Sequence, residues 1–160
     1  MRDDVIRKFY SSFANLDAGG MADCYADDVV FNDPVFQNLR GKDAGDMWRM
    51  LCEQAKGDLA VVVSNVRVNS DGEGDIGHAH WVATYHFGPK RRSVVNRIDA
   101  TFRFNGAGQI VEHTDVFDMW RWSRMALGVP GVLLGWSPFL QNQVRAQAKK
   151  GLKRFQDKRA

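Results

Sequence analysis

Four segments with strand-like alternation follow one another between residues 59 and 122, and they constrain the fold more than any other feature of the chain. Short stretches that each contain glycine separate them and suit hairpin connections. Consecutive strands joined by hairpins pair in an antiparallel sheet. The sequence therefore predicts a meander with strands over 59–70, 76–87, 93–104 and 109–122.

The part of the chain before this meander indicates helices. Residues 2–16 place apolar side chains at helical spacing, and the Gly-Gly pair at 19–20 is expected to end that helix. A short helix over 21–26, a short strand over 29–32 and a third helix over 40–55 follow. Helices that precede a meander indicate an α+β fold, with three N-terminal helices packed on one face of an antiparallel sheet.

Composition narrows the class of protein. A chain of 160 residues, 44% of them hydrophobic, is long enough to bury a core. The N-terminus carries acidic residues where an export signal would be apolar, so we expect a cytoplasmic location. The spacing of Cys24 and Cys52 fits neither a disulfide framework nor a metal site, and both are predicted to be reduced core thiols. No metal or other cofactor is expected.

Positive charge is concentrated at the C-terminal end. Residues 138–160 contain seven Lys or Arg and one acid, whereas residues 1–137 contain fifteen Lys or Arg and eighteen acids. A body with an excess of acids is not typical of a nucleic-acid-binding domain, so we expect no nucleic-acid partner.

Asp33 stands between a short strand and Pro34, in the sequence FNDPVF. Asp before Pro is turn chemistry, because proline fixes φ and Asp bonds readily to its own backbone. A carboxylate where a strand ends is also a candidate functional group. These residues alone leave both interpretations open.

One face of the strand over 109–122 combines His113 and Asp115 with large apolar neighbours such as Phe117. Side chains two residues apart share a face of a strand, so the imidazole and the carboxylate are within reach of each other. The alternation does not decide whether this face is covered or solvated. On the strand over 76–87 three histidines share the face opposite Trp81, and we expect a surface role rather than a metal site for His78, His80 and His86.

The order of elements and two motifs, YADDVVFNDPVF and FRFNGAGQIV, resemble the nuclear transport factor 2-like superfamily. That superfamily includes ketosteroid isomerase, limonene epoxide hydrolase and the SnoaL-like polyketide cyclases. The resemblance covers residues 3–120 approximately. It implies a cone-shaped roll in which the helices pack on a curved sheet, and homodimerisation through that sheet.

Carried over by position, Asp33 matches the general base of ketosteroid isomerase. The oxyanion-binding tyrosine of that enzyme falls on Phe9 or, with a shift of one residue, on Tyr10. Its acid falls on Ala100, with Asp99 one place away on the opposite strand face.

Two further relatives in the superfamily bear on the last strand. Asp115 falls at the place of the water-activating aspartate of limonene epoxide hydrolase, but Trp81 and Ala83 stand where that enzyme has its Arg and second Asp. A pair formed by His113 and Asp115 fits the SnoaL-like cyclases.

The resemblance thus implies a pocket with Asp33, His113 and Asp115 as catalytic residues. The expected activity is acid/base proton transfer on a hydrophobic small molecule, as an isomerase, cyclase or hydratase. The alternative is a noncatalytic ligand-binding or dimerisation module. The walls of the pocket are expected to come from Tyr10, Trp48, Trp81, Tyr85, Asn96, Phe102 and Phe117.

Residues 123–160 are expected to extend the superfamily domain of residues 1–122, in the manner of a bacterial branch of the superfamily. They comprise a broken apolar segment over 123–138 and a basic amphipathic helix over 139–155. The extension can close the open end of the cone, pack on a second subunit, or touch an anionic membrane surface. The packing stripe on the helix favours the first two placements over the third. In the first of these placements, the side chains that could plug the cone are Val132, Leu133, Leu134 and Trp136.

Overall fold

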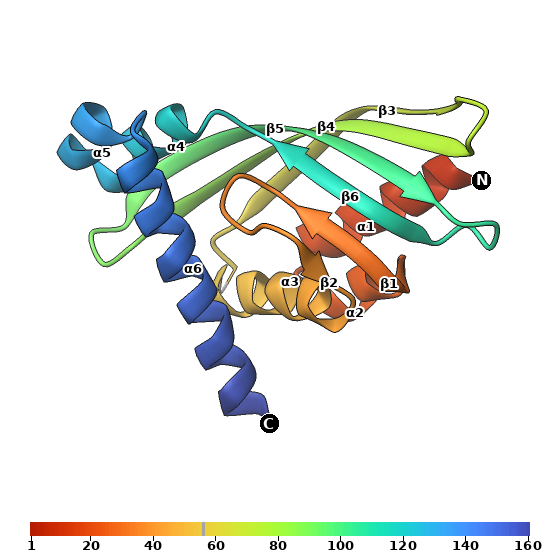
Figure 1. Cartoon of the computed structure of the whole chain (residues 1–160), viewed down its shortest axis with the longest axis horizontal. Coiled ribbons are helices and arrows are strands. Elements are labelled where there is room, and N and C mark those ends of the chain that lie inside the picture. The colour runs from red at the N-terminus through yellow and green to blue at the C-terminus, as the bar shows by residue number, and fades with distance from the viewer. Residues whose placement is uncertain (56) are drawn as a thin grey trace.

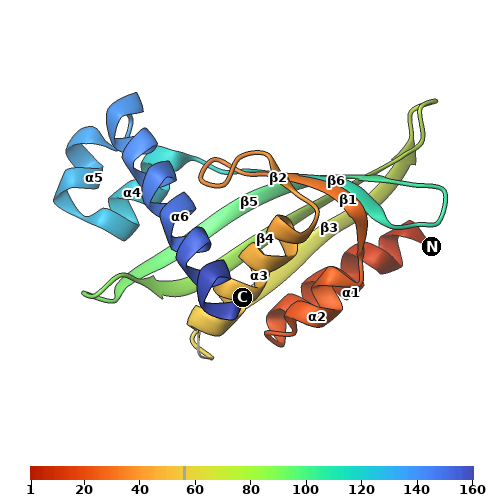
Figure 2. The same cartoon turned by 60° about the horizontal axis from the view of Figure 1, so that its bottom comes forward.

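The structure is a computed structural model that describes residues 1–55 and 57–160. A curved six-stranded sheet carries the N-terminal helices on one face, and three further helices gather at one end of it (Figure 1). The N-terminus lies at the opposite end of the sheet (Figure 2). This arrangement confirms the predicted α+β cone.

The sheet contains the predicted meander in the order β2-β1-β6-β5-β4-β3. The four meander strands pair antiparallel with their neighbours, as the hairpin signals predict. The parallel pairing of β1 with β6 was not predicted. The strands are β1 (Tyr25–Asn32), β2 (Leu39–Arg40), β3 (Ala60–Ser70), β4 (Asp75–Phe87), β5 (Arg92–Phe104) and β6 (Ile110–Val116).

The N-terminal helices are α1 (Arg2–Ala14), α2 (Ala18–Ala22) and α3 (Lys42–Ala55). The prediction around α2 was wrong, because the Gly-Gly pair lies inside this helix and the chain enters β1 at Tyr25. The Asp17 carboxylate accepts a hydrogen bond from the backbone N–H of Gly20 at 3.0 Å and so starts α2. A Cβ at Gly20 would overlap Ser12 and Asp17, so glycine here allows close helix packing.

The last strand is shorter than predicted. It ends at Val116, and α4 (Met119–Leu127) replaces its predicted C-terminal part. The Asp118 carboxylate accepts a hydrogen bond from the backbone N–H of Arg121 at 3.0 Å and caps this helix. Large and polar side chains alternate in this segment, so the pattern predicted a strand and the N-cap at Asp118 was missed.

The concave face of the sheet is the covered one. Ala100 of β5 pairs with Asp115 of β6, and Phe102 pairs with His113, and all four side chains are buried. The outer face carries the histidines of β4 together with Asp99, as the strand alternation predicts. Cys24 and Cys52 are free and buried, which confirms the predicted core thiols.

The C-terminal extension folds back on the sheet. Helix α4 packs on β5, and α5 (Val129–Leu134) and α6 (Pro138–Arg159) follow (Figure 1). Helix α6 reaches α3, where the side-chain amide of Gln156 donates to Asp43 at 2.8 Å and to Asp46 at 3.0 Å. The boundary expected after residue 122 lies inside α4, and the division into two parts stays a prediction.

The residues considered as a plug for the cone do not fill it. Met119, Trp122 and Ala126 of α4 are the buried side chains at this end, packed with Val94 of β5. The four residues expected to fill the cone are exposed instead, because α5 turns away from the sheet; they are Val132, Leu133, Leu134 and Trp136. Among the described residues, no helix is long and apolar enough to cross a membrane.

Candidate active site

Asp33 stands in a tight turn directly after β1. Its Oδ1 accepts hydrogen bonds from the backbone N–H groups of Val35 at 2.7 Å and Phe36 at 2.5 Å. The backbone N–H of Asp33 donates to the carbonyl of Phe36 at 2.8 Å, which closes the turn. The turn interpretation of FNDPVF is therefore correct, and it fixes the position of a partly buried carboxyl.

The pKa of the Asp33 carboxyl is raised from its ordinary value to about 7. Burial is the largest cause, since an apolar environment disfavours the charged form. The N–H of Phe36 opposes this effect, whereas the negative charge of Asp115 adds to it. A buried carboxyl whose pKa is raised toward neutral pH is a frequent feature of acid/base sites.

His113 lies at the centre of the concave face, with no exposed surface. Its Nε2 is 2.9 Å from Oδ1 of Asp115, and its Nδ1 is 2.8 Å from the hydroxyl of Tyr25. The Tyr25 hydroxyl in turn accepts a hydrogen bond from the indole N–H of Trp48 at 2.8 Å. Phe102 packs on the imidazole, with ring centroids 4.3 Å apart.

These contacts define the protonation pattern of the chain of hydrogen bonds. The Tyr25 hydroxyl receives a proton from Trp48, so its own proton is free to donate to Nδ1 of His113. Nε2 then carries the imidazole proton and donates to the Asp115 carboxylate. With the proton on Nε2, the imidazole accepts from Tyr25 and donates to Asp115, so every N–H and O–H in this chain of hydrogen bonds has an acceptor.

Asp115 is 3% exposed and lies beside both His113 and Trp81. The indole N–H of Trp81 is 3.4 Å from the same Oδ1 that His113 contacts. In the described part of the chain, these hydrogen bonds to the carboxylate both end on Oδ1. Its Oδ2 is therefore the oxygen left for another partner.

Tyr10 projects from α1 into the same interior and is 1% exposed. Its ring packs against Trp81 and Phe102, with centroids 5.6 and 6.2 Å away. Burial and the charge of Asp115 raise the pKa of its hydroxyl well above the ordinary value, so the group is a neutral donor. Among the described residues this hydroxyl has no hydrogen-bond partner.

The structure places the other expected wall residues in two groups. Trp48, Trp81 and Phe102 are buried in the centre, around His113. Tyr85, Asn96 and Phe117 face the same side of the sheet nearer to α4, and the hydroxyl of Tyr85 accepts a hydrogen bond from the indole of Trp122 at 2.8 Å. Burial raises the pKa of Tyr85 and the charge of Asp33 adds to it, and Val35 packs in the same cluster as Tyr85 and Phe117, so the second group borders the Asp33 turn.

Sequence reasoning missed Tyr25, the hydroxyl that orients His113. The expected helix over 21–26 was the reason, since it removed this residue from the strand. Alternation gave no signal for it, because Asp27, at the odd-numbered position between Tyr25 and Val29, is exposed, and the register of β1 shifts between Tyr25 and Val30.

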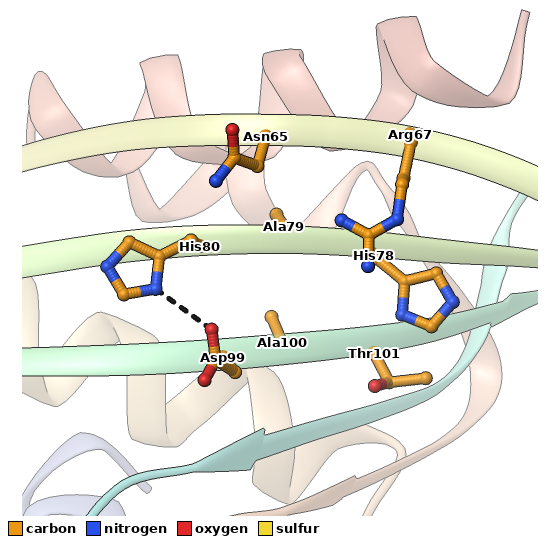
Figure 3. Close-up of a pocket in the computed structure, with 8 residues that line it drawn as sticks. All are labelled: Asn65, Arg67, His78, Ala79, His80, Asp99, Ala100 and Thr101. Atoms are coloured by element: carbon orange, nitrogen blue, oxygen red, sulfur yellow. Dashed lines mark hydrogen bonds and ion pairs between the residues drawn. The ribbon is translucent and has the colours of Figure 1, made fainter.

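The outer face of the sheet has a shallow hollow of about 180 Å³, bordered by side chains of β3, β4 and β5 (Figure 3). His80 and Asp99 point toward each other across it, with Nδ1 and Oδ1 2.9 Å apart. Asp99 therefore turns away from the interior, and Ala100 occupies the inward position. No group of three potential metal ligands gathers here or elsewhere in the residues that the structure describes.

A cone-shaped α+β roll with ionisable groups under its helices defines the class of fold. The family model of the SnoaL-like domain matches residues 6–113. The chain belongs to this family, which lies within the nuclear transport factor 2-like superfamily.

Solved structures of low sequence identity share the fold. One is a provisionally named polyketide cyclase from Xanthomonas campestris pv. campestris, with 19% identity, a TM-score of 0.58, and coverage of 76% of this chain and 93% of that one. A second is an LEH-like epoxide hydrolase from M. tuberculosis, with 20% identity, a TM-score of 0.55, and coverage of 83% and 95%.

A third is SalBIII, an epoxide hydrolase/cyclase-like enzyme of pyran ring formation in the polyether salinomycin. It has 15% identity, a TM-score of 0.60, and coverage of 74% of this chain and 91% of that one. No curated protein matches this chain.

Proposed function

We propose that the protein is an enzyme that transfers protons on a hydrophobic small molecule, as an isomerase, cyclase or hydratase. The observation that carries this proposal is the Asp33 carboxyl, whose pKa is raised to about 7 by burial and, in part, by the charge of Asp115, the partner of buried His113. A carboxyl with a pKa near neutral pH exists in both protonation states, which suits a general base that must release its proton again.

Asp33 is the proposed base because it is the accessible member of the group. It is partly buried at the end of the cone, whereas His113 and Asp115 lie deeper. Its Oδ1 is held by two backbone N–H groups, which leaves Oδ2 to take a proton from the substrate. The turn thus fixes the carboxylate without neutralising it.

Tyr10 is the proposed donor to a substrate oxygen. A buried hydroxyl without a partner is unfavourable by about 1–3 kcal/mol, so a ligand oxygen that accepts from it gains stabilisation. Ala100 offers no second donor where ketosteroid isomerase has an acid. The donor set therefore favours a SnoaL-like cyclase or a hydratase over the two-donor isomerase.

His113 and Asp115 are the proposed acid partner, with Tyr25 as the residue that orients them. The Tyr25 hydroxyl holds Nδ1, so the imidazole presents Nε2 to Asp115. When this pair acts as the acid, Asp115 carries a proton on Oδ2 and donates it to the substrate, while Asp33 takes a proton from the substrate. The apolar walls proposed to bind the substrate are Tyr10, Trp48, Trp81, Tyr85, Asn96, Phe102 and Phe117.

The test uses a panel of hydrophobic ketones, epoxides and unsaturated esters incubated with the protein in deuterated water. We expect deuterium incorporation or product formation with one class, detected by mass spectrometry. Asp33→Asn should reduce that rate by about a hundredfold or more, in keeping with general base catalysis. The matched control is Asp99→Asn on the outer face, which should retain the rate.

Unchanged turnover in both Asp33→Asn and His113→Ala would exclude the proposed roles. Circular dichroism of each variant shows whether a lost activity reflects a lost fold.

The second candidate function is a noncatalytic ligand-binding or dimerisation module. It is favoured by the interior itself, because Trp48, Trp81 and Phe102 pack directly around His113. Binding of a panel compound without turnover, measured by calorimetry, would support this alternative. A homodimer formed through the sheet and a cytoplasmic location also stay proposals, and analytical ultracentrifugation tests the dimer.

A further inference from the structure

The helix α5 and its flanks expose an unusual amount of apolar surface. Val129 is 70% exposed, Leu133 64%, Trp136 62% and Phe139 68%. We call this surface the α5 patch. A monomeric protein rarely leaves so many large apolar side chains together in water, and such a patch marks an interaction site. The α5 patch consists of Trp120, Val129, Val132, Leu133, Leu134, Trp136 and Phe139.

The α5 patch is held in place rather than loosely attached. Gly131 of α5 lies so close to α4 that a Cβ there would overlap the carbonyl of Ser123. The indole N–H groups of Trp120 and Trp136 donate to the carbonyls of Val132 at 3.2 Å and Leu133 at 3.0 Å. Their polar atoms are therefore satisfied within the fold, and what the patch presents outward is apolar.

The surrounding segment is strongly basic. From residue 119 to the C-terminus the chain has nine Lys or Arg and a single acid, Asp157. The first 118 residues have thirteen Lys or Arg and eighteen acids. The exposed apolar surface lies where α5 joins α6, and most of the positive charge follows along α6, which runs from there to the C-terminus (Figure 1).

The geometry of α6 aligns the two properties. The inward face of α6 includes Val144 and Leu152, which are partly or fully buried. Phe139 and Lys150 are eleven residues apart, about three helical turns, so both lie on the outward face. At a rise of 1.5 Å per residue, Phe139 lies about 20 Å along the helix from Lys153, which is on the same outward face. One surface thus presents apolar side chains at one end and cations along the rest.

We propose that the α5 patch and the outward face of α6 bind the surface of a bilayer rich in anionic phospholipids. Apolar side chains that enter the interfacial region, together with cations that meet anionic headgroups, bind a protein to a membrane surface without crossing it. Anionic headgroups complement the cations, and the acyl boundary accepts Leu133, Trp136 and Phe139. The acidic body of the chain is repelled and faces away.

A second copy of the chain fits this surface less well. A symmetric pairing would bring two α5 patches together and would also place two strongly cationic segments side by side. Like charges in contact oppose such an interface. Charge complementarity therefore favours an anionic lipid surface as the occupant.

The test is flotation of the full-length protein with vesicles. We expect binding to vesicles of phosphatidylcholine and phosphatidylglycerol at three to one, at least tenfold weaker binding to pure phosphatidylcholine, and a marked loss in 0.5 M NaCl. The variant Leu133→Ser with Phe139→Ser should bind at least tenfold more weakly. Its matched control is Val62→Ser with Val116→Ser, since these valines of the sheet are 66% and 61% exposed and lie outside the patch.

A second pair of variants tests the charge. Lys150→Gln, Lys153→Gln and Arg154→Gln together should weaken binding several-fold at low salt. The same change at three exposed cations elsewhere, Arg7, Arg67 and Arg97, should leave binding unchanged.

Two results would overturn the proposal. The first is no binding of the wild-type protein to the anionic vesicles. The second is equal losses in the patch variant and its control. Oligomeric state is measured on the same samples, and dissociation of an oligomer by Leu133→Ser and Phe139→Ser without any change in lipid binding would assign the patch to a second copy instead.

Discussion

At the scale of single residues, two buried tyrosines differ in whether their hydroxyl groups have hydrogen-bond partners. The Tyr25 hydroxyl connects Trp48 to His113 and is fully used by the fold. The Tyr10 hydroxyl is buried as deeply but has no partner in the described residues. The same functional group therefore contributes to stability at one position and not at the other.

Replacing each tyrosine by phenylalanine tests this difference. Tyr25→Phe should lower the free energy of unfolding by about 1–3 kcal/mol, because the Trp48 N–H and His113 Nδ1 both lose their partner. Tyr10→Phe should raise it by about 1–3 kcal/mol, because the change removes a buried hydroxyl that has no partner. Urea denaturation at one pH measures both, and equal losses would contradict the hydrogen-bond assignment.

Asp33 should give stability an unusual pH dependence. An unfolded aspartate has a pKa of about 3.9, whereas the folded-state pKa is about 7. Between these values the folded chain keeps a proton that the unfolded chain has released. This carboxyl therefore makes the folded state less stable as the pH rises from about 4 to about 7, and the loss is complete above that window.

The variant Asp33→Asn removes this titration and keeps an oxygen that can accept from Val35 and Phe36. We expect it to gain stability relative to wild type as the pH rises from 4 to 8, measured by urea denaturation at several pH values. Asp28→Asn, at an exposed position of β1, is the control and should show no such gain. A constant difference between wild type and Asp33→Asn would show that the carboxyl titrates normally.

At the scale of elements, two glycines in helices have opposite roles. Gly131 allows α5 to approach α4, where a Cβ would overlap the Ser123 carbonyl. Gly45 lies inside α3, and a Cβ there would meet no atom within 4 Å. The sequence pattern does not distinguish these two glycines. The role of each depends on whether another segment packs against it.

Alanine at each position should change stability in opposite directions. Gly131→Ala should destabilise the protein by about 1–3 kcal/mol, because α5 must shift away from α4. Gly45→Ala should stabilise it by about 0.5–1 kcal/mol, because glycine is a poor helix former. Thermal unfolding gives the signs, and hydrogen exchange of residues 119–134 in Gly131→Ala should rise. Stabilisation by both changes would contradict the close packing of α4 and α5.

Element boundaries show where sequence patterns were sufficient. The meander strands were predicted to within a residue or two at most ends, because alternation and hairpin glycines are local signals. The end of β6 was not, because Asp118 caps a helix that starts in the middle of an alternating pattern. The start of β1 was missed for a similar reason, since Tyr25 follows directly after a short helix.

At the scale of the whole molecule, α6 connects the extension to the proposed site. The Arg145 guanidinium donates to the carbonyl of Pro34 at 2.8 Å, so a residue 111 positions away in the chain holds the turn of Asp33. Helix α4 reaches the same region through the cluster that contains Val35 and Phe117. The extension thus adjoins the Asp33 turn with one surface and presents the α5 patch with the other.

The sequence by itself determined the strands, the shared face of His113 and Asp115, and the turn at Asp33. These follow from interactions between residues close in the chain, whose period and geometry the sequence contains directly. Only the tertiary structure decided that this face is covered, that Tyr25 orients His113, and that α4 rather than α5 packs on the sheet. Each of these depends on which distant segments meet, and burial and hydrogen bonding between them are settled only when the whole chain packs.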